Sequence, residues 1–160
     1  MISDAPIPIG ERGRAAWAAV REFARTGFGN RGGWTALQFR LALATTAEMS
    51  GRDAVMRELL TKGPPGRAVV RIGSCDALAW VEVRHGALSW GRGVSPIGPD
   101  VEIIFRDEAT AAAALRGQLD QLAALGRGDI VVRGLVPLAE TLGRVMDRLG
   151  LYFRRHGRLT

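Results

Sequence analysis

Apolar residues recur at helical spacing in the first part of the chain. In Glu11–Thr26 they lie three or four positions apart, with arginines largely elsewhere on the helical wheel, which predicts an amphipathic helix. Trp34–Met49 predicts a second helix, apolar on more than one face and therefore well buried. Ser50-Gly-Arg-Asp53 has the spacing of a capping box and is expected to open a third helix, which ends at Gly63 before two prolines.

After Gly66 the apolar residues recur at every second position, which is typical of β-strands. Strands are expected at Arg67–Gly73, Ala77–Arg84, Ala87–Arg92 and Asp100–Arg106. A two-residue turn at His85-Gly86 predicts a hairpin that pairs Val83 with Leu88 and Val81 with Trp90 on an apolar face. The opposite face is polar, so burial of one face fixes the register.

The last part of the chain mixes helices with one more strand. Asp107 is expected to cap a helix over Ala109–Arg116, and a shorter helix over Gln118–Leu125 ends at Gly126. A compact strand lies in Gly128–Gly134. The final helix carries a continuous apolar stripe of Leu138, Leu142, Val145, Met146, Leu149 and Phe153. This order of elements predicts an α+β fold and not alternating βαβ units.

The composition is that of an ordinary globular domain: 160 residues, 47% of them apolar and 24% charged. The single cysteine, Cys75, forms no intramolecular disulfide, and no Cys/His cluster has the spacing of zinc ligands. The N-terminus does not resemble a signal peptide, and no apolar run is long enough to span a membrane. These features predict a cytoplasmic protein without a cofactor.

Basic residues exceed acidic ones, giving a formal net charge of +6, and every basic residue except Lys62 is an arginine. No basic stripe with exposed aromatic residues and no nucleic-acid-reading motif accompanies them, so a nucleic-acid partner is not expected. The excess is concentrated near the C-terminus, in Arg144, Arg148, Arg154, Arg155 and Arg158. This cluster either contacts anionic lipid headgroups or forms a solvated helix face and tail.

Residues that carry chemistry are few. His85 fits the backbone of a tight turn, Cys75 lies in a connection between strands, and Asp107-Glu108 suits a helix start. Gly27–Gly33 lacks the strand and the Gly-Lys-Ser/Thr signature of a phosphate loop. His156, in the basic tail, has no nucleophile–base context. We therefore expect no catalytic residue and no metal site.

From about Arg67 to Phe153 the chain resembles the sterol carrier protein type 2 family. The resemblance rests on the ordered set of the hairpin at His85-Gly86, the strand at Asp100–Arg106, the acid-opened helix at Asp107-Glu108 and the Gly128–Gly134 strand. It implies a five-stranded, mainly antiparallel sheet covered on one side by helices. It also implies an apolar tunnel for a fatty acid, sterol, quinone or other lipid. The chain ends in Arg158-Leu159-Thr160 and so departs from the family's peroxisomal Ser-Lys-Leu address.

The predicted binding site lies between the apolar sheet face and the last helix. Its residues are Val81, Val83, Leu88, Trp90, Ile103, Phe105, Leu142, Val145, Met146 and Leu149. The sequence leaves open whether these enclose a cavity or a filled core. Residues 1–66 form an N-terminal helical extension to the domain at 67–160, and they either cap the tunnel, form a homodimer interface or dock a partner enzyme. A lipid carrier is the leading hypothesis. An accessory protein of a biosynthetic complex and an enzyme built on the same pocket are the alternatives.

Overall fold

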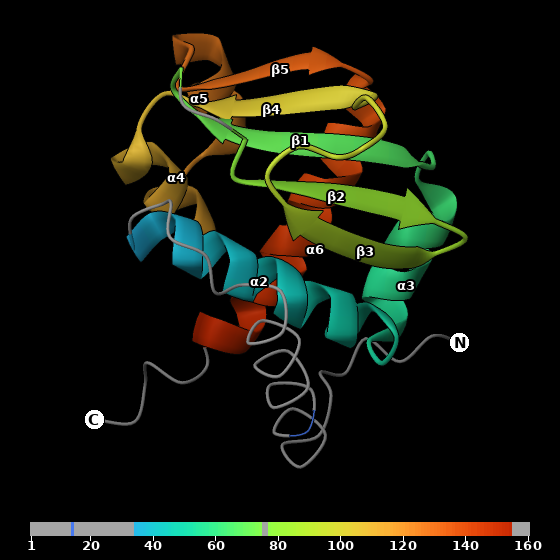
Figure 1. Cartoon of the computed structure of the whole chain (residues 1–160). Helices are drawn as coiled ribbons and strands as arrows, with labels where there is room; N and C mark the ends of the chain where they lie inside the picture. Colours follow the sequence, from blue (N-terminus) through green and yellow to red (C-terminus); the bar gives the residue numbers. More distant parts are fainter. Residues whose placement is uncertain (1–13, 15–33, 75–76, 155–160) are drawn as a thin grey trace.

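A computed structural model describes residue 14, residues 34–74 and residues 77–154 of the chain. Apart from Arg14, the predicted helix Glu11–Thr26 lies outside the described residues, as do the glycine-rich segment 27–33, Cys75 and His156. The described elements, labelled as in Figure 1, are α2 (Trp34–Ser50), α3 (Ala54–Lys62), β1 (Gly66–Ile72), β2 (Ala79–Arg84), β3 (Ala87–Arg92), β4 (Val101–Phe105), α4 (Glu108–Leu115), α5 (Gln121–Arg127), β5 (Ile130–Gly134) and α6 (Val136–Arg154).

The five strands form one sheet in the order β3-β2-β1-β4-β5. The central pair, β1 and β4, is parallel, and the other three pairs are antiparallel. Because β1 and β4 run in the same direction, the chain crosses from one to the other through the β2–β3 hairpin and the segment that follows it. The predicted α+β class with a mainly antiparallel sheet is therefore confirmed.

The hairpin has the predicted register. Val83 pairs with Leu88, and Val81 pairs with Trp90. His85 has a φ of 52° and Gly86 a φ of 74°, so both turn residues adopt the left-handed conformation that a tight hairpin turn requires. The interpretation of His85 as a turn residue agrees with this backbone geometry.

Helices α2, α3 and α6 lie on one face of the sheet (Figure 1). Phe39 and Leu43 of α2 and Met56 and Leu60 of α3 belong to the same core cluster as the inward residues of the sheet and α6. The described part of residues 1–66 thus shares one core with the rest of the protein. Within residues 34–74 and 77–154, no helix combines the length and hydropathy needed to cross a membrane.

The capping box predicted at Ser50 is wrong. Ser50 is the last residue of α2, and its hydroxyl donates to the carbonyl of Ala47. Asp53 is instead the N-cap of α3 and accepts hydrogen bonds from the backbone N–H groups of Val55 and Met56. A carboxylate at the N-cap position satisfies these two amides directly, so the serine three residues earlier is not needed.

The short helix before β5 begins and ends later than predicted. It spans Gln121–Arg127, with Asp120 as its N-cap and Gly128 as its C-cap. Gly128 has a φ of 74°, the left-handed conformation that ends many helices, whereas Gly126 lies within the helix. The carboxylate of Asp120 accepts a hydrogen bond from the N–H of Ala123 and so fixes the first turn.

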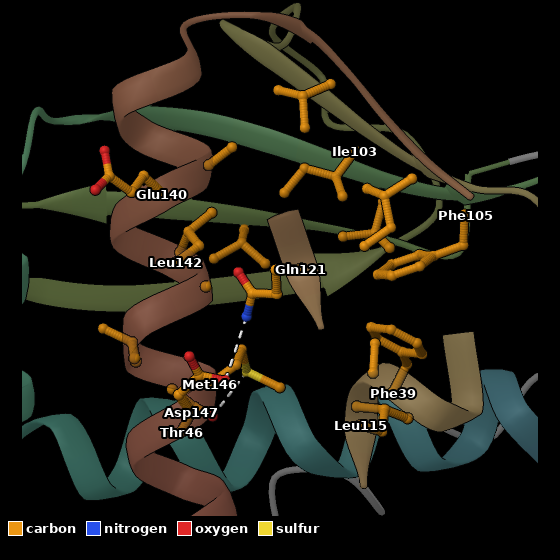
Figure 2. Close-up of a pocket in the computed structure, with 18 of the residues that line it drawn as sticks. Phe39, Thr46, Ile103, Phe105, Leu115, Gln121, Glu140, Leu142, Met146 and Asp147 are labelled. Carbon is orange, nitrogen blue, oxygen red and sulfur yellow. Dashed lines mark hydrogen bonds between the residues drawn. The ribbon is translucent and has the colours of Figure 1, made fainter. Parts of the chain in front are cut away.

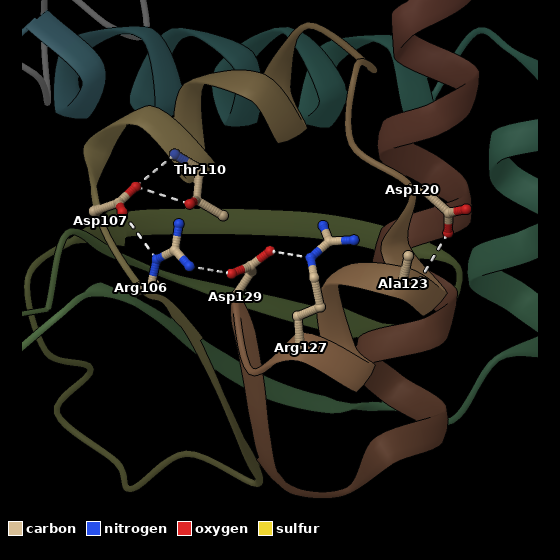
Figure 3. A network of polar contacts seen from close by, with 7 residues as sticks. All are labelled: Arg106, Asp107, Thr110, Asp120, Ala123, Arg127 and Asp129. Atoms are coloured by element: carbon tan, nitrogen blue, oxygen red, sulfur yellow. Dashed lines mark hydrogen bonds and ion pairs between the residues drawn. The ribbon is translucent and has the colours of Figure 1, made fainter.

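A polar network ties the starts of α4 and β5 to the end of β4 (Figure 3). Asp107, the N-cap of α4, accepts hydrogen bonds from the Thr110 N–H and hydroxyl, both 2.8 Å long. Arg106 bridges Asp107 to Asp129, which also accepts from Arg127 at 2.8 Å. The interpretation of Asp107 as a helix-start residue is therefore confirmed.

We predict that Asp107 makes the stability of the protein depend on acid. The backbone N–H of Thr110, followed by the Thr110 hydroxyl and Arg106, lowers the pKa of Asp107 to about 2. In the unfolded chain the pKa of an aspartate is about 3.9. The stabilisation that the ionised Asp107 gives the folded state is therefore complete above that pH and is lost as the pH falls towards 2. Thermal unfolding of Asp107→Asn should show a deficit relative to wild type at pH 5 that shrinks towards pH 2 and is lost as the pH falls through that value.

Glu108→Gln is the matched control, because it removes a negative charge at the same helix end without touching the hydrogen bonds of Thr110. Its difference from wild type should not follow the titration of Asp107. A deficit of Asp107→Asn that stays constant from pH 5 to pH 2 would contradict this account.

Candidate functional site

A cavity of about 380 Å³ lies between the sheet and the helices, and Figure 2 shows many of its lining residues. Its volume falls within the range of roughly 300–1,000 Å³ typical of small-molecule sites. Every strand contributes to its walls, together with α2, α4, α5 and α6. The lining residues are Phe39, Leu43, Thr46, Val70, Val81, Leu88, Ile103, Phe105, Ala114, Leu115, Gln121, Leu122, Leu125, Ile130, Val132, Val136, Ala139, Glu140, Leu142, Gly143, Val145, Met146 and Asp147.

The inner end of the cavity is aromatic and aliphatic. The rings of Phe39 and Phe105 lie with their centroids 5.4 Å apart and their planes tilted by 52°, a favourable arrangement for an aromatic pair. Leu115 lies beside this pair (Figure 2). Val70 and Ile103, which are partners across the parallel β1–β4 pair, form part of the floor.

The structure brings seven of the ten predicted site residues to the cavity wall. They are Val81, Leu88, Ile103, Phe105, Leu142, Val145 and Met146. Val83, Trp90 and Leu149 are not among the lining residues and pack in the surrounding core.

Neighbouring helices account for these three exceptions. Val83 lies near the hairpin turn, where α3 packs so closely that a Cβ on Gly86 would clash with the Thr61 hydroxyl. Trp90 belongs to β3, which packs against α2, and Leu149 lies in the part of α6 beyond the cavity. These three side chains therefore pack against other protein side chains and do not border the cavity.

Sequence reasoning missed the walls that α2 and α5 supply. Phe39, Leu43 and Thr46 come from α2, and Leu122 and Leu125 come from α5. Phe39 and Leu43 are four residues apart on a helix, which places them on one face, but that helix has apolar residues on other faces too. The spacing of Leu122 and Leu125 could have indicated that both face the site, because residues three apart on a helix also share a face.

The cavity opens between α5 and α6. Most of its lining residues are buried or half-buried, and the exposed ones all come from these two helices: Gln121, Leu122, Leu125, Val136, Glu140 and Asp147. We call these six residues the mouth. Leu122 is 82% exposed, which is the highest exposure among the apolar residues of the mouth. Gly143 lies beside the mouth, where a Cβ would come within 2.8 Å of Gln121 Oε1, so its missing side chain leaves room for α5.

Four of the described lining residues are polar, and each has a partner in the protein. The Thr46 hydroxyl donates to the carbonyl of Ala42 at 2.7 Å and lies 3.6 Å from the sulfur of Met146. At the mouth, the Gln121 amide donates to Asp147 at 3.2 Å, and Arg144 donates to Glu140. The interior is therefore apolar, and its charged side chains lie at the opening.

Arg148, one of the arginines predicted to contact lipid headgroups, instead forms an ion pair within the fold. The side chain of Arg148, 12% exposed, pairs with Asp53 at 3.1 Å, and Tyr152 donates its hydroxyl to the same carboxylate oxygen. Burial by itself raises the pKa of Asp53, but the hydrogen bonds from Tyr152, Met56 and Arg148 outweigh it, so the pKa is lowered overall. Arg155 and Arg158 of the predicted basic cluster lie outside the described residues.

No family model matches this sequence. No curated protein matches it either. Solved structures do match the fold. The apo form of sterol carrier protein 2 from Yarrowia lipolytica has a TM-score of 0.57 and 13% sequence identity, over 73% of this chain and 93% of that one. A crystal structure of sterol carrier protein 2 has a TM-score of 0.52 and 18% identity, over 66% of this chain and 91% of that one. The chain has the fold of sterol carrier protein 2.

The structural similarity between this chain and sterol carrier protein 2 extends beyond residues 67–160. Those residues are less than two thirds of the chain, whereas the Yarrowia match covers 73% of it, so the match includes residues before Arg67. A ubiquinone synthesis protein, UbiJ, shares the fold with a TM-score of 0.50 and 13% identity, over 67% of this chain and 93% of that one. At these identities the likeness concerns the fold, and the function has to be argued from the site.

Proposed function

We propose that this protein binds a lipid or another lipophilic small molecule in the cavity and acts as its carrier or presenter. The observation that carries the proposal is an apolar cavity of about 380 Å³ that opens to solvent between α5 and α6. Transferring apolar surface from water gains roughly 25 cal/mol per Å², so a long hydrocarbon chain has a large driving force to enter. The sterol-carrier fold supports the same function.

We also propose that the protein carries its ligand without changing it. The polar side chains of the described lining lie at the mouth or, in the case of Thr46, bond to a backbone carbonyl. A chain inside the cavity would meet aliphatic and aromatic groups along most of its length. The named ubiquinone synthesis protein makes a quinone one of the lipophiles to look for, beside fatty acids and sterols.

Native mass spectrometry of the purified protein, followed by organic extraction, tests the proposal. We expect a lipophile at one molecule per chain, and saturable binding of the neutral fluorescent probe N-phenyl-1-naphthylamine after its removal. The extracted compound, added back and incubated, should be recovered with its mass unchanged. A clean apo mass together with no saturable probe binding would contradict the proposal, and a changed mass would favour an enzyme.

A further inference from the structure

The charged residues that line the cavity are all acidic. Among the described residues these are Glu140 and Asp147, both on α6 and both at the mouth. No arginine lines the cavity in this part of the chain, although the protein has a formal net charge of +6. The charge at the opening is therefore opposite in sign to that of the whole molecule.

The two carboxylates differ in how far they are neutralised. Glu140 forms an ion pair with Arg144, one helical turn away. Asp147 accepts a hydrogen bond from the neutral amide of Gln121, and no cation of residues 34–74 or 77–154 forms an ion pair with it. Asp147 therefore has acceptor capacity left beside the opening, because a carboxylate offers about four lone-pair sites.

Other positive groups near the mouth are already paired with carboxylates other than Asp147. Arg127, at the end of α5, pairs with Asp129. The N-terminus of α5 is met by the carboxylate of Asp120, which accepts from Ala123. Asp147 lies about three turns from the start of α6, beyond the reach of that helix's positive end, which falls off within the first turn. The two described arginines that flank Asp147 on α6 also pair with other carboxylates, Arg144 with Glu140 and Arg148 with Asp53.

We propose that this mouth selects lipophiles whose polar end donates hydrogen bonds and carries no negative charge, such as a long-chain alcohol or amine, over carboxylates. The proposal rests on the proposed function. An apolar chain that fills the inner end near Phe39 and Phe105 leaves its polar end at the opening. A donor there bonds to Asp147, whereas a carboxylate there meets like charge. Like charges about 4 Å apart repel strongly enough, even in water, to weaken binding by about fivefold, and more where solvent is partly excluded.

Three probes with the same sixteen-carbon chain test the proposal on the full-length protein: hexadecan-1-ol, hexadecylamine and hexadecanoate. Each competes with N-phenyl-1-naphthylamine at pH 8, below its aggregation concentration. We expect the alcohol and the amine to displace the probe at about tenfold lower concentration than hexadecanoate. Asp147→Asn keeps an acceptor for Gln121 but removes the charge, so the advantage of the amine over hexadecanoate should shrink to about twofold.

Glu108→Gln is the matched control, because it removes an exposed negative charge on α4 that does not line the cavity. It should leave the order and spacing of the three probes as in wild type. Equal or tighter binding of hexadecanoate by the wild-type protein would overturn this proposal and leave the proposed function intact. An unchanged preference in Asp147→Asn would overturn it as well. If neither the dye nor any of the three compounds binds, the proposed function fails, and this proposal fails with it.

Discussion

Replacing Asp53 with alanine is expected to lower the free energy of unfolding by about 3–5 kcal/mol, the range for removing one partner of a buried ion pair. The Asp53 side chain is 2% exposed and caps the first turn of α3. The same carboxylate is the shared acceptor for Arg148 and Tyr152 near the end of α6. Its loss removes the helix cap and the polar link between two helices at once. Urea denaturation of the variant measures the effect.

Two variants separate the cap from the buried link. Asp120→Ala removes an exposed N-cap, that of α5, and should cost about 1 kcal/mol. Tyr152→Phe removes one hydrogen bond to Asp53 and should also cost about 1 kcal/mol. If Asp53→Ala costs no more than Asp120→Ala, the link between α3 and α6 contributes nothing to stability.

Ala139→Phe is expected to weaken the binding of a lipophilic probe by at least tenfold while the protein stays folded. Ala139 lies on α6, is half-buried and lines the cavity, so a larger side chain there takes up space that a ligand would use. Filling an existing cavity does not force neighbouring side chains apart, and cavity filling commonly stabilises a protein by about 0.5–2 kcal/mol. Probe titration and thermal unfolding of the same samples measure both effects.

The matched control is Ala109→Phe, which makes the same change at an exposed position of α4 that does not line the cavity. Its affinity for the probe should equal that of wild type. Wild-type affinity in Ala139→Phe would mean that the probe binds somewhere else on the protein.

The sheet was predictable because alternation and turn chemistry agree. A slip by one residue in the hairpin would turn Val81 and Val83 to solvent, so the apolar face and the His85-Gly86 turn permit one register. The short helix α5 was less predictable, because two nearby glycines both resemble a helix end. Backbone conformation decides between them, and only Gly128 has a positive φ. The carboxylate of Asp120 was the overlooked signal for its start.

The sequence predicted which face of the sheet the site lies on, but not where that face borders an open cavity. Val81 and Val83 lie on the same side of the same strand, yet one lines the cavity and the other packs in the surrounding core. The difference comes from the helices opposite them, and a single sequence does not specify how far a helix stands from a sheet. The mouth was missed for a similar reason, since Leu122 and Asp147 become neighbours of one opening only through the placement of α5 beside α6.

The parallel pairing of β1 with β4 at the centre of the sheet has a kinetic consequence. The β2–β3 hairpin joins neighbours in sequence, whereas Ala68 must find Val101 across the whole hairpin and the loop after it, which makes this a slow contact to form. Val70 and Ile103 meet in that pairing and form part of the cavity floor, so the cavity exists only once the pairing is complete. A molecule held inside therefore stabilises the finished sheet and none of its precursors, and it prolongs the lifetime of the native state without hastening its formation.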